Sequence, residues 1–307
     1  GVFVNKDYRN FASPRNRTIA FVAQDLYDGV VLKLLSAIEL RARRSGYFVL
    51  VSNSMLDFDI EKGVLENLLY SNVFGVILFP ISGNKNVSSA RKLIAAGIPV
   101  VTIDNIFSDD DIDSIDCDNF DMGYKATEFL LKNGHSNIVH ITVSKENFSN
   151  NHVAQKRLAG FQQAMKDYGK ECPPENILYL SWKYTSLPFA EIDIENLGYE
   201  QARAALQREN RPTAIFVMFD EIAAGVYRAA HDLGLAIPRD LSVIGVNNVS
   251  LCNQLSPRLT TIAQPFSALG FRAVEILLMR SVPNHNRCIK EELFGTLVQR
   301  DSVAPAL

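Results

Sequence analysis

Most signatures of enzymes and metalloproteins are missing from this sequence of 307 residues. It contains no GxG, so the dinucleotide-binding fingerprint fails at its first step. It also has no GxxxxGK[ST], no GxSxG and no HExxH, and its five histidines show no spacing typical of paired ligands. We therefore expect a binding protein that is not an enzyme and that uses no cofactor and no metal.

Cysteine is scarce and irregularly placed. The four cysteines are far apart and form no CxxC: Cys117, Cys172, Cys252 and Cys288. This spacing favours isolated thiols in a reducing cytoplasm over a disulfide framework or a zinc site.

The chain also lacks an excess of positive charge and long apolar runs. It has 31 lysines and arginines against 34 acidic residues, a net charge of -3, whereas surfaces that bind nucleic acid are usually basic. No apolar run approaches the ~18 residues of a membrane span, and no signal peptide begins at residue 1. We therefore expect a cytoplasmic chain that does not itself bind nucleic acid.

One acidic cluster allows two interpretations. Its members are Asp109, Asp110, Asp111, Asp113 and Asp116. Such a set can in principle hold a cation, but it lacks the glycine and the spacing of a calcium loop. We expect a solvated loop here.

Short β-branched runs alternate with helical patterns along most of the chain. The expected strands are residues 18–23, 47–52, 75–79, 99–103, 137–142, 178–180, 214–217 and 242–246. The expected helices are residues 30–45, 60–70, 88–96, 124–133, 153–168, 196–207 and 221–233. Continuous apolar strands separated by helices predict parallel sheets covered on both faces. The expected fold class is therefore α/β, with two doubly wound parallel-sheet lobes.

Ligands of such sheets bind at the carboxyl ends of the strands. The residues that follow the expected strands are mostly polar or acidic: Gln24, Asp25, Pro80, Asp104, Asn105, Ser144, Lys145, Phe219, Asp220, Asn247 and Asn248. With so few fixed positive charges, they suit a neutral, hydroxyl-rich ligand better than a phosphate. Asp220 is expected to be the N-cap of the helix that follows it.

Several motifs in the second half of the chain occur together. Residues 133–138 read NGHSNI, residues 157–161 read RLAGF and residues 237–245 read IPRDLSVIG. Residues 257–262 read PRLTTI, with QP at 264–265 and LG at 269–270, and residues 297–302 read LVQRDS. From residue 17 onward the chain resembles the effector-binding core of the lac/galactose repressor family, whose fold is that of the type I periplasmic sugar-binding proteins.

Two glycines of these motifs have a structural interpretation as well. Gly134 is expected to end a helix in the left-handed conformation, and Gly160 to permit close packing of two helices.

The resemblance implies a division of the chain. Residues 17–117 and 264–293 would form the N-terminal lobe, and residues 118–263 and 294–307 the C-terminal lobe, joined by hinge crossovers. Residues 1–16 would be the end of a DNA-binding head and a linker. Their opening GVFV is similar to the last wing strand of a gluconate-repressor-type winged helix, which points to a hybrid regulator like the arabinose repressor. The alternative is that these apolar residues carry no such meaning.

The resemblance also implies a sugar site. Arg157 would fork onto adjacent sugar hydroxyls, and Asn247 stands where many relatives have an aspartate. Asp104 and Gln264 fit either a ligand contact or a structural role. The remaining expected pocket residues are Gln24, Tyr27, Asp28, Trp182 and Phe219. Trp182 fits either stacking on a sugar or burial in the core. Because Arg157 would lie at the mouth of a cleft, it is expected to support little of the core.

These features predict a homodimeric, sugar-responsive transcription regulator. A sugar bound between the lobes would shift them and so control operator binding through the head. The alternative is a periplasmic sugar-binding protein of a transporter, which would have the same lobes. The PRLTTI and QP motifs and the scattered thiols favour the regulator.

Overall fold

The computed structural model describes residues 17–26, 29–81, 85–104, 111–148, 151–181, 192–280 and 288–306. The chain divides into two units, and each is compact. The first contains the described residues up to Leu26, together with Val31–Ile115 and Ser267–Lys290. The second consists mainly of Asp116–Phe266 and Glu291–Leu307. The chain thus passes from one unit to the other after Ile115, Phe266 and Lys290.

The first sheet has the strand order β11-β5-β4-β3-β1-β2. Its strands are β1 (Thr18–Ala23), β2 (Phe48–Asn53), β3 (Gly75–Phe79), β4 (Val100–Ile103), β5 (Asp113–Cys117) and β11 (Lys290–Leu293). β1 pairs in parallel with both β2 and β3, so the strand order reverses direction between β1 and β3. In doubly wound sheets, ligands bind outside the carboxyl ends of the strands at such a point.

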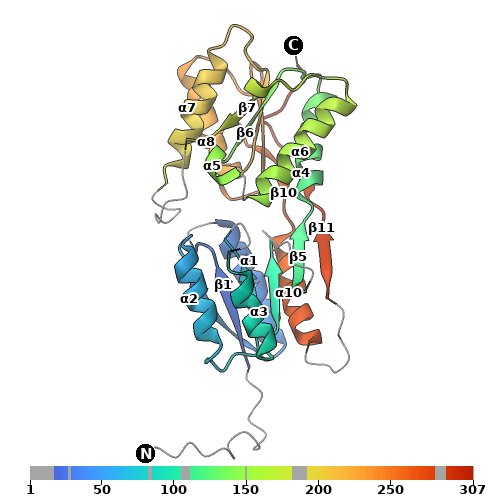
Figure 1. The fold of residues 1–307 in the computed structure, drawn as a ribbon. Helices are drawn as coiled ribbons and strands as arrows, with labels where there is room; N and C mark the ends of the chain where they lie inside the picture. The colour runs from blue at the N-terminus through green and yellow to red at the C-terminus, as the bar shows by residue number, and fades with distance from the viewer. Residues whose placement is uncertain are drawn as a thin grey trace, which may run out of the picture. The chain divides into compact units, whose positions relative to one another are not determined.

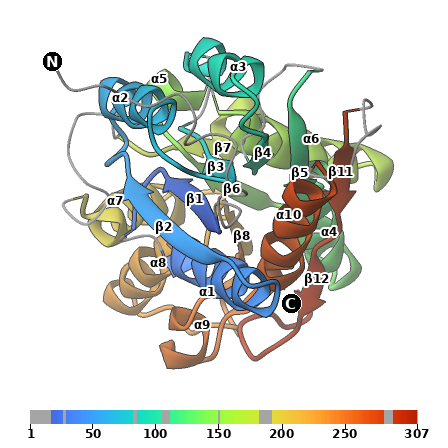
Figure 2. The same cartoon turned by 90° about the horizontal axis from the view of Figure 1, so that it is seen from below.

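Two pairs of helices cover this sheet (Figures 1 and 2). On one face, α2 (Phe58–Leu68) and α3 (Val87–Ala95) pack their apolar stripes on alternate residues of β1 and β3. On the other face lie α1 (Gly29–Arg44) and α10 (Phe266–Met279). A Cβ at Gly270 of α10 would lie 2.8 Å from the Cβ of Ala37 of α1, so these two helices touch closely.

The second sheet repeats the plan with the order β12-β10-β9-β8-β6-β7. Its strands are β6 (Ile138–Thr142), β7 (Ile177–Tyr179), β8 (Ala214–Val217), β9 (Ser242–Val246), β10 (Thr260–Ala263) and β12 (Thr296–Val298). β6 pairs in parallel with β7 and β8, and the β10–β12 pair is antiparallel. The order therefore reverses between β6 and β8.

The helices of the second unit also pack in pairs (Figure 1). They are α4 (Asn119–Lys132), α6 (His152–Asp167), α7 (Ile194–Leu206) and α8 (Glu221–Asp232), with short turns α5 (Lys145–Phe148) and α9 (Leu251–Gln254). A Cβ at Gly160 of α6 would lie 2.1 Å from the carbonyl oxygen of Phe120, and one at Gly123 of α4 would lie 2.1 Å from that of Arg157. The two helices are therefore in backbone contact, as expected for Gly160.

The structure confirms the α/β class with two doubly wound, mostly parallel sheets. It also confirms the left-handed Gly134, whose φ is 87°. The solvated acidic loop is wrong for Asp113 and Asp116, which are buried in strand β5. The physical reason is the ion pair of Asp113 with Arg280 and its hydrogen bond from the Ile289 amide at 2.8 Å.

Candidate functional site

Strained backbone marks the carboxyl ends of the strands. Among the described residues, the non-glycine residues with positive φ are Met55 (52°), Leu56 (58°), Asp104 (46°), Asn247 (113°) and Asn248 (53°). Every one of them lies within three residues of the end of β2, β4 or β9. Such conformations cost free energy and cluster at binding sites, where the surroundings enforce them. These edges are therefore the candidate sites, one in each unit.

In the second unit, Asn247 and Gln264 form a buried amide pair. The Gln264 Nε2 donates to the Asn247 Oδ1 at 2.7 Å. The backbone N–H of Asn247 donates to the Ile262 carbonyl at 2.9 Å. The Gln264 Oε1 is buried and has no hydrogen-bond partner among the described residues. A buried acceptor without a donor is costly and rare in native proteins. This oxygen is therefore suited to a donor from a bound molecule.

Asp220 supports the turn that carries Asn247. Its carboxylate accepts from the Thr261 hydroxyl at 2.7 Å and the Val249 amide at 3.0 Å, so it links the residues after β9 to β10. Burial raises the pKa of Asp220 to about 6, and hydrogen bonds from Cys252 and Thr261 oppose this rise. Asp220 does occupy the N-cap position of α8, but its side chain makes no capping hydrogen bond. The expected N-cap position is therefore confirmed, but the carboxylate accepts from Thr261 of β10 and from the Val249 amide instead of capping the helix.

Arg157 is held just after the end of β8, where Met218 follows the strand. The Asn151 side chain caps α6 by accepting from the Ala154 amide at 2.8 Å, and Arg157 follows within the next turns. Its Nε donates to the Asn119 Oδ1 at 3.0 Å, and its Nη1 donates to the Met218 carbonyl at 2.6 Å. The side chain is only 2% exposed. The expectation that Arg157 supports little of the core is therefore wrong, because buried acceptors depend on its donors.

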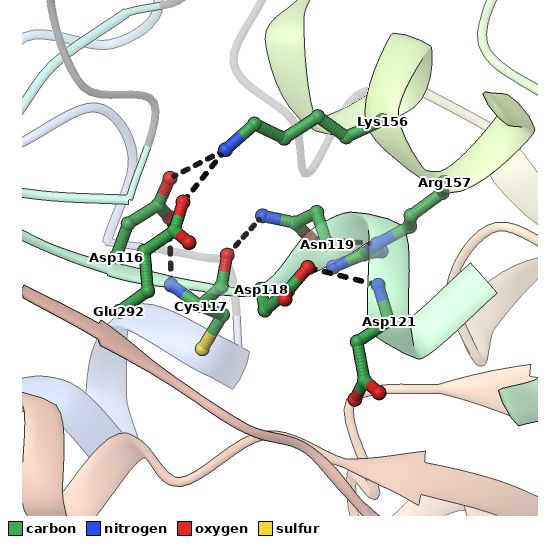
Figure 3. Close-up of polar contacts among 8 residues, drawn as sticks. All are labelled: Asp116, Cys117, Asp118, Asn119, Asp121, Lys156, Arg157 and Glu292. Carbon is green, nitrogen blue, oxygen red and sulfur yellow. Dashed lines mark hydrogen bonds and ion pairs between the residues drawn. The ribbon is translucent and has the colours of Figure 1, made fainter. Parts of the chain in front are cut away.

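Asn119 fixes the orientation of this arginine. Its Nδ2 donates to the Cys117 carbonyl at 3.0 Å, which leaves its Oδ1 facing Arg157 (Figure 3). Asn119 was not predicted as a site residue, because the expected helix began only at residue 124 and Arg157, its partner, lies 38 residues further along the chain.

The other described site residues that were expected also follow the ends of strands. Gln24 is half-buried directly after β1, and its carbonyl accepts from the Leu56 amide at 2.8 Å. Asp104 is buried directly after β4, and its amide donates to the Ile115 carbonyl at 3.2 Å. Phe219 is half-buried after β8, beside Met218 and thus near the Arg157 guanidinium. Three expected residues lie outside the described part of the chain: Tyr27, Asp28 and Trp182.

Glu61 of α2 is a buried acid that the sequence gives no reason to suspect. Its two carboxylate oxygens accept from the Ile81 amide and the Asn86 side chain, each at 2.8 Å, so it anchors the segment after β3. Burial raises the pKa of Glu61 to about 7, although both hydrogen bonds lower it. A glutamate in an amphipathic helix is normally solvated, and its partners lie 20 and 25 residues further along the chain.

His140 lies in the core of β6, near the site arginine. Its ring stacks on Phe161 and Phe216, with centroids 5.4 and 4.4 Å away, and its Nδ1 lies 3.1 Å from the Phe216 carbonyl. Burial lowers the pKa of His140 to about 3, the charge of Arg157 lowers it further, and the Phe216 carbonyl opposes both. The ring is therefore neutral when the protein is folded.

This histidine makes the stability depend on pH. The unfolded chain protonates His140 near its ordinary pKa of about 6.5, whereas the folded chain does not, so stability is lost as the pH falls below that value. We expect the free energy of unfolding to fall by about 2 kcal/mol from pH 7.5 to pH 5 because the unfolded chain takes up a proton at His140. Denaturant melts of the wild type and of His140→Gln across this range measure it.

The effect of His140 is the difference between the free energies of unfolding of the wild type and of His140→Gln at each pH. The total alone does not give it, because Glu61 and Asp220 change the stability with pH in the opposite direction. Their pKa values are raised in the folded protein, so they add stability as the pH falls. Parallel pH profiles for the wild type and His140→Gln would contradict the assignment.

The chemistry of these edges suits binding. Amide groups, one guanidinium and one half-buried phenyl ring offer donors, acceptors and an apolar surface for a molecule rich in hydroxyls. In the part of the chain that the structure describes, no cluster of three or more metal-ligating side chains occurs. Nor does any helix within the described ranges have the length and hydropathy to cross a membrane.

Comparison with known proteins gives consistent results. A family model described as "Periplasmic binding protein-like domain" matches residues 127–303. The chain is 30% identical over 269 residues to catabolite control protein A of Priestia megaterium, covering 88% of this chain and 76% of that protein. It is 29% identical over 279 residues to the ribose operon repressor of Haemophilus influenzae, covering 91% of this chain and 79% of the repressor.

A solved structure extends the similarity to the fold. The chain superposes on a LacI family transcriptional regulator from Enterococcus faecium with bound ribose, with a TM-score of 0.78 at 25% identity. The match covers 94% of this chain and 100% of that one.

Proposed function

Because this chain belongs to the lac/galactose repressor (LacI) family of transcription regulators, we propose that it binds a sugar or sugar derivative at the carboxyl ends of its strands. Sugar binding would control how the regulator binds operator DNA, through a head that lies outside the described residues. The chain is a regulator rather than an enzyme, since its relatives include transcriptional repressors such as the ribose operon repressor. A cytoplasmic location follows from this proposal.

The observation that carries the proposal is the Gln264 Oε1, a buried acceptor to which none of the described residues donates a hydrogen bond. It lies in the amide pair with Asn247, and Arg157 is in the same unit at the end of β8. A sugar hydroxyl can donate to an amide oxygen while accepting from a guanidinium or an amide N–H. Ribose is the first ligand to test, because one similar regulator was solved with bound ribose and one relative is a ribose operon repressor.

We expect D-ribose, or another pentose or hexose, to raise the melting temperature. Ligand at 100 times its dissociation constant stabilises the folded state by about 2.7 kcal/mol. For units of this size, that is a shift of roughly 5–11 °C. A thermal-shift screen of pentoses, hexoses and sugar acids measures it.

Matched variants test the site within the same screen. Gln264→Ala and Asn247→Gly should each lose part of the shift; glycine is chosen at position 247 because its φ of 113° strains an alanine. Gln163→Ala, on the exposed side of α6, serves as the control. If no sugar of these classes shifts the melting temperature, the proposed ligand class is wrong.

The first unit carries an exposed apolar surface on α1 and β2, which we call the apolar edge. Its residues are Leu32, Leu40, Phe48, Leu50 and Val51. β2 is the last strand of its sheet, so its outer backbone groups pair with no strand that the structure describes. An apolar, unpaired edge strand is a surface that another chain can cover. We propose that a second copy covers it, because a two-fold dimer matches a palindromic operator.

Disrupting the apolar edge should therefore give a monomer. Phe48 is 77% exposed, so Phe48→Glu removes apolar contact area and adds a charge without disturbing the fold. We expect light scattering at tens of micromolar to show a dimer for the wild type and a monomer for Phe48→Glu. Tyr70→Glu is the control, since Tyr70 is 90% exposed elsewhere in the same unit. A monomeric wild type would count against the dimer.

A further inference from the structure

One lysine contacts two strands that pass between the units. The Lys156 Nζ lies 3.0 Å from the Glu292 Oε1 on β11 and 3.9 Å from the Asp116 Oδ2 on β5 (Figure 3). Lys156 itself belongs to α6 and directly precedes Arg157. All three charged groups belong to the second unit.

The two acids lie at the places where the chain changes units. β5 leaves the first unit after Ile115, so Asp116 is the first residue of the second unit on that strand. β11 leaves the first unit after Lys290, and Glu292 follows almost at once. The Asp118 amide also donates to the Leu293 carbonyl at 2.9 Å, so the two crossing strands run side by side here.

Lys156 is the counter-ion of a cluster of three acidic residues, Asp116, Asp118 and Glu292. Partial burial opposes the charge of Lys156, but the hydrogen bond to Glu292 and the charges of Asp116, Glu292 and Asp118 outweigh burial and raise its pKa. The Asp116 side chain is only 5% exposed, so salt screens it less than a surface group. Without the lysine, carboxylates on both crossing strands would face one another and repel.

We propose that Lys156 is a clamp on the two crossing strands, and that its ion pairs limit the arrangements that β5 and β11 can adopt where they enter the second unit. The clamp thereby sets the populations of the relative positions open to the two units. Because Arg157 is the next residue of the same helix and is held rigidly, a ligand that binds it shifts α6 as a whole and the clamp with it; this last step rests on the proposed function.

A small energy is enough for this role. A partly exposed ion pair adds little to global stability, yet the same energy changes the ratio of two nearly equal populations by about two- to five-fold. Loss of the clamp should therefore change the distribution of distances between the units much more than it changes the melting temperature.

Distances between spin labels measure this effect in the intact chain. Labels are placed at Lys62→Cys on α2 and Ala204→Cys on α7, both exposed, after the partly exposed Cys172 and Cys288 are replaced by serine. Mixing with excess unlabelled chain ensures that each measured pair lies within one molecule. No sugar is added, so the result does not depend on the proposed ligand.

We expect Lys156→Met to shift or broaden the distance distribution, with a change of about two-fold or more in the ratio of its populations. Glu292→Gln should do the same to a smaller degree, and it is safe for folding because Glu292 is half-exposed. The double variant Lys156→Glu with Glu292→Lys should recover part of the wild-type distribution. Lys132→Met is the control, because Lys132 pairs with Glu128 at 2.9 Å on α4, away from the crossing strands.

The clamp is wrong if both Lys156→Met and Glu292→Gln give distributions that superpose on the wild type. A second series with D-ribose tests the coupling separately. A shift of the wild-type distribution by D-ribose that persists unchanged in Lys156→Met would refute the coupling while leaving the clamp itself intact.

Discussion

Replacing Arg157 by alanine should lower the free energy of unfolding by about 2–4 kcal/mol and abolish most of the sugar-induced thermal shift. The loss of stability follows from the two buried acceptors, the Asn119 Oδ1 and the Met218 carbonyl, that would lose their donors. The loss of binding follows from the charged donors that adjacent hydroxyls would no longer meet. Urea melts without ligand and thermal shifts with D-ribose measure the two losses independently.

Two further variants separate fold from binding. Lys166→Ala lies on the exposed face of the same helix and should change the stability by no more than about 0.5 kcal/mol. Arg157→Lys keeps the charge but not the planar fork, so it should retain more stability than alanine while still losing affinity. An Arg157→Ala protein that keeps full sugar affinity would remove Arg157 from the site.

Gly160→Ala should cost about 3 kcal/mol or more, because no room exists for one added carbon. Its Cβ would lie 2.1 Å from the Phe120 carbonyl oxygen and 2.7 Å from the Tyr124 nitrogen. Both are backbone atoms of α4, so relief requires the two helices to separate. Chemical denaturation followed by circular dichroism measures this cost.

The same substitution at Gly63, Gly63→Ala, should raise the free energy of unfolding instead of lowering it. Gly63 lies within α2, and a Cβ there would meet nothing within 4 Å. Alanine should therefore stabilise the helix by about 0.5–1 kcal/mol, because it restricts the unfolded chain and favours the helix. Equal effects of the two substitutions would show that α4 and α6 are not in backbone contact.

The sequence predicted the regular part of the fold well, because buried parallel strands are continuous apolar runs. It failed for β5, where Asp113, Ser114 and Asp116 break up the apolar residues and look like a solvated loop. The partner that makes the burial of Asp113 possible is Arg280, 167 residues away, and no local pattern indicates such a pairing. It also failed to predict α10, even though its buried residues Leu269, Ala273, Ile276 and Leu277 recur at helical spacing.

The site was predicted in part. Asn247 and Gln264 were chosen from a family motif, and the structure joins them by a hydrogen bond across 17 residues. Their contact with a ligand stays a prediction, as it does for Arg157 and Asp104. The roles of Asp220, Asn119 and Glu61 could not be predicted, since each acts through contacts with distant backbone or side chains that spacing does not encode.

The glycine contact between α4 and α6 has a consequence for selectivity. The carbonyl of Arg157 packs against Gly123 of α4, and the guanidinium of the same residue bonds to Asn119 at the start of α4. The arginine is thus preorganised at both its backbone and its tip, and binding need not freeze a mobile side chain. Such a site gains affinity for the one hydroxyl geometry that it matches, and it cannot reshape itself around epimers. We expect a specialist receptor that discriminates between stereoisomers of one sugar.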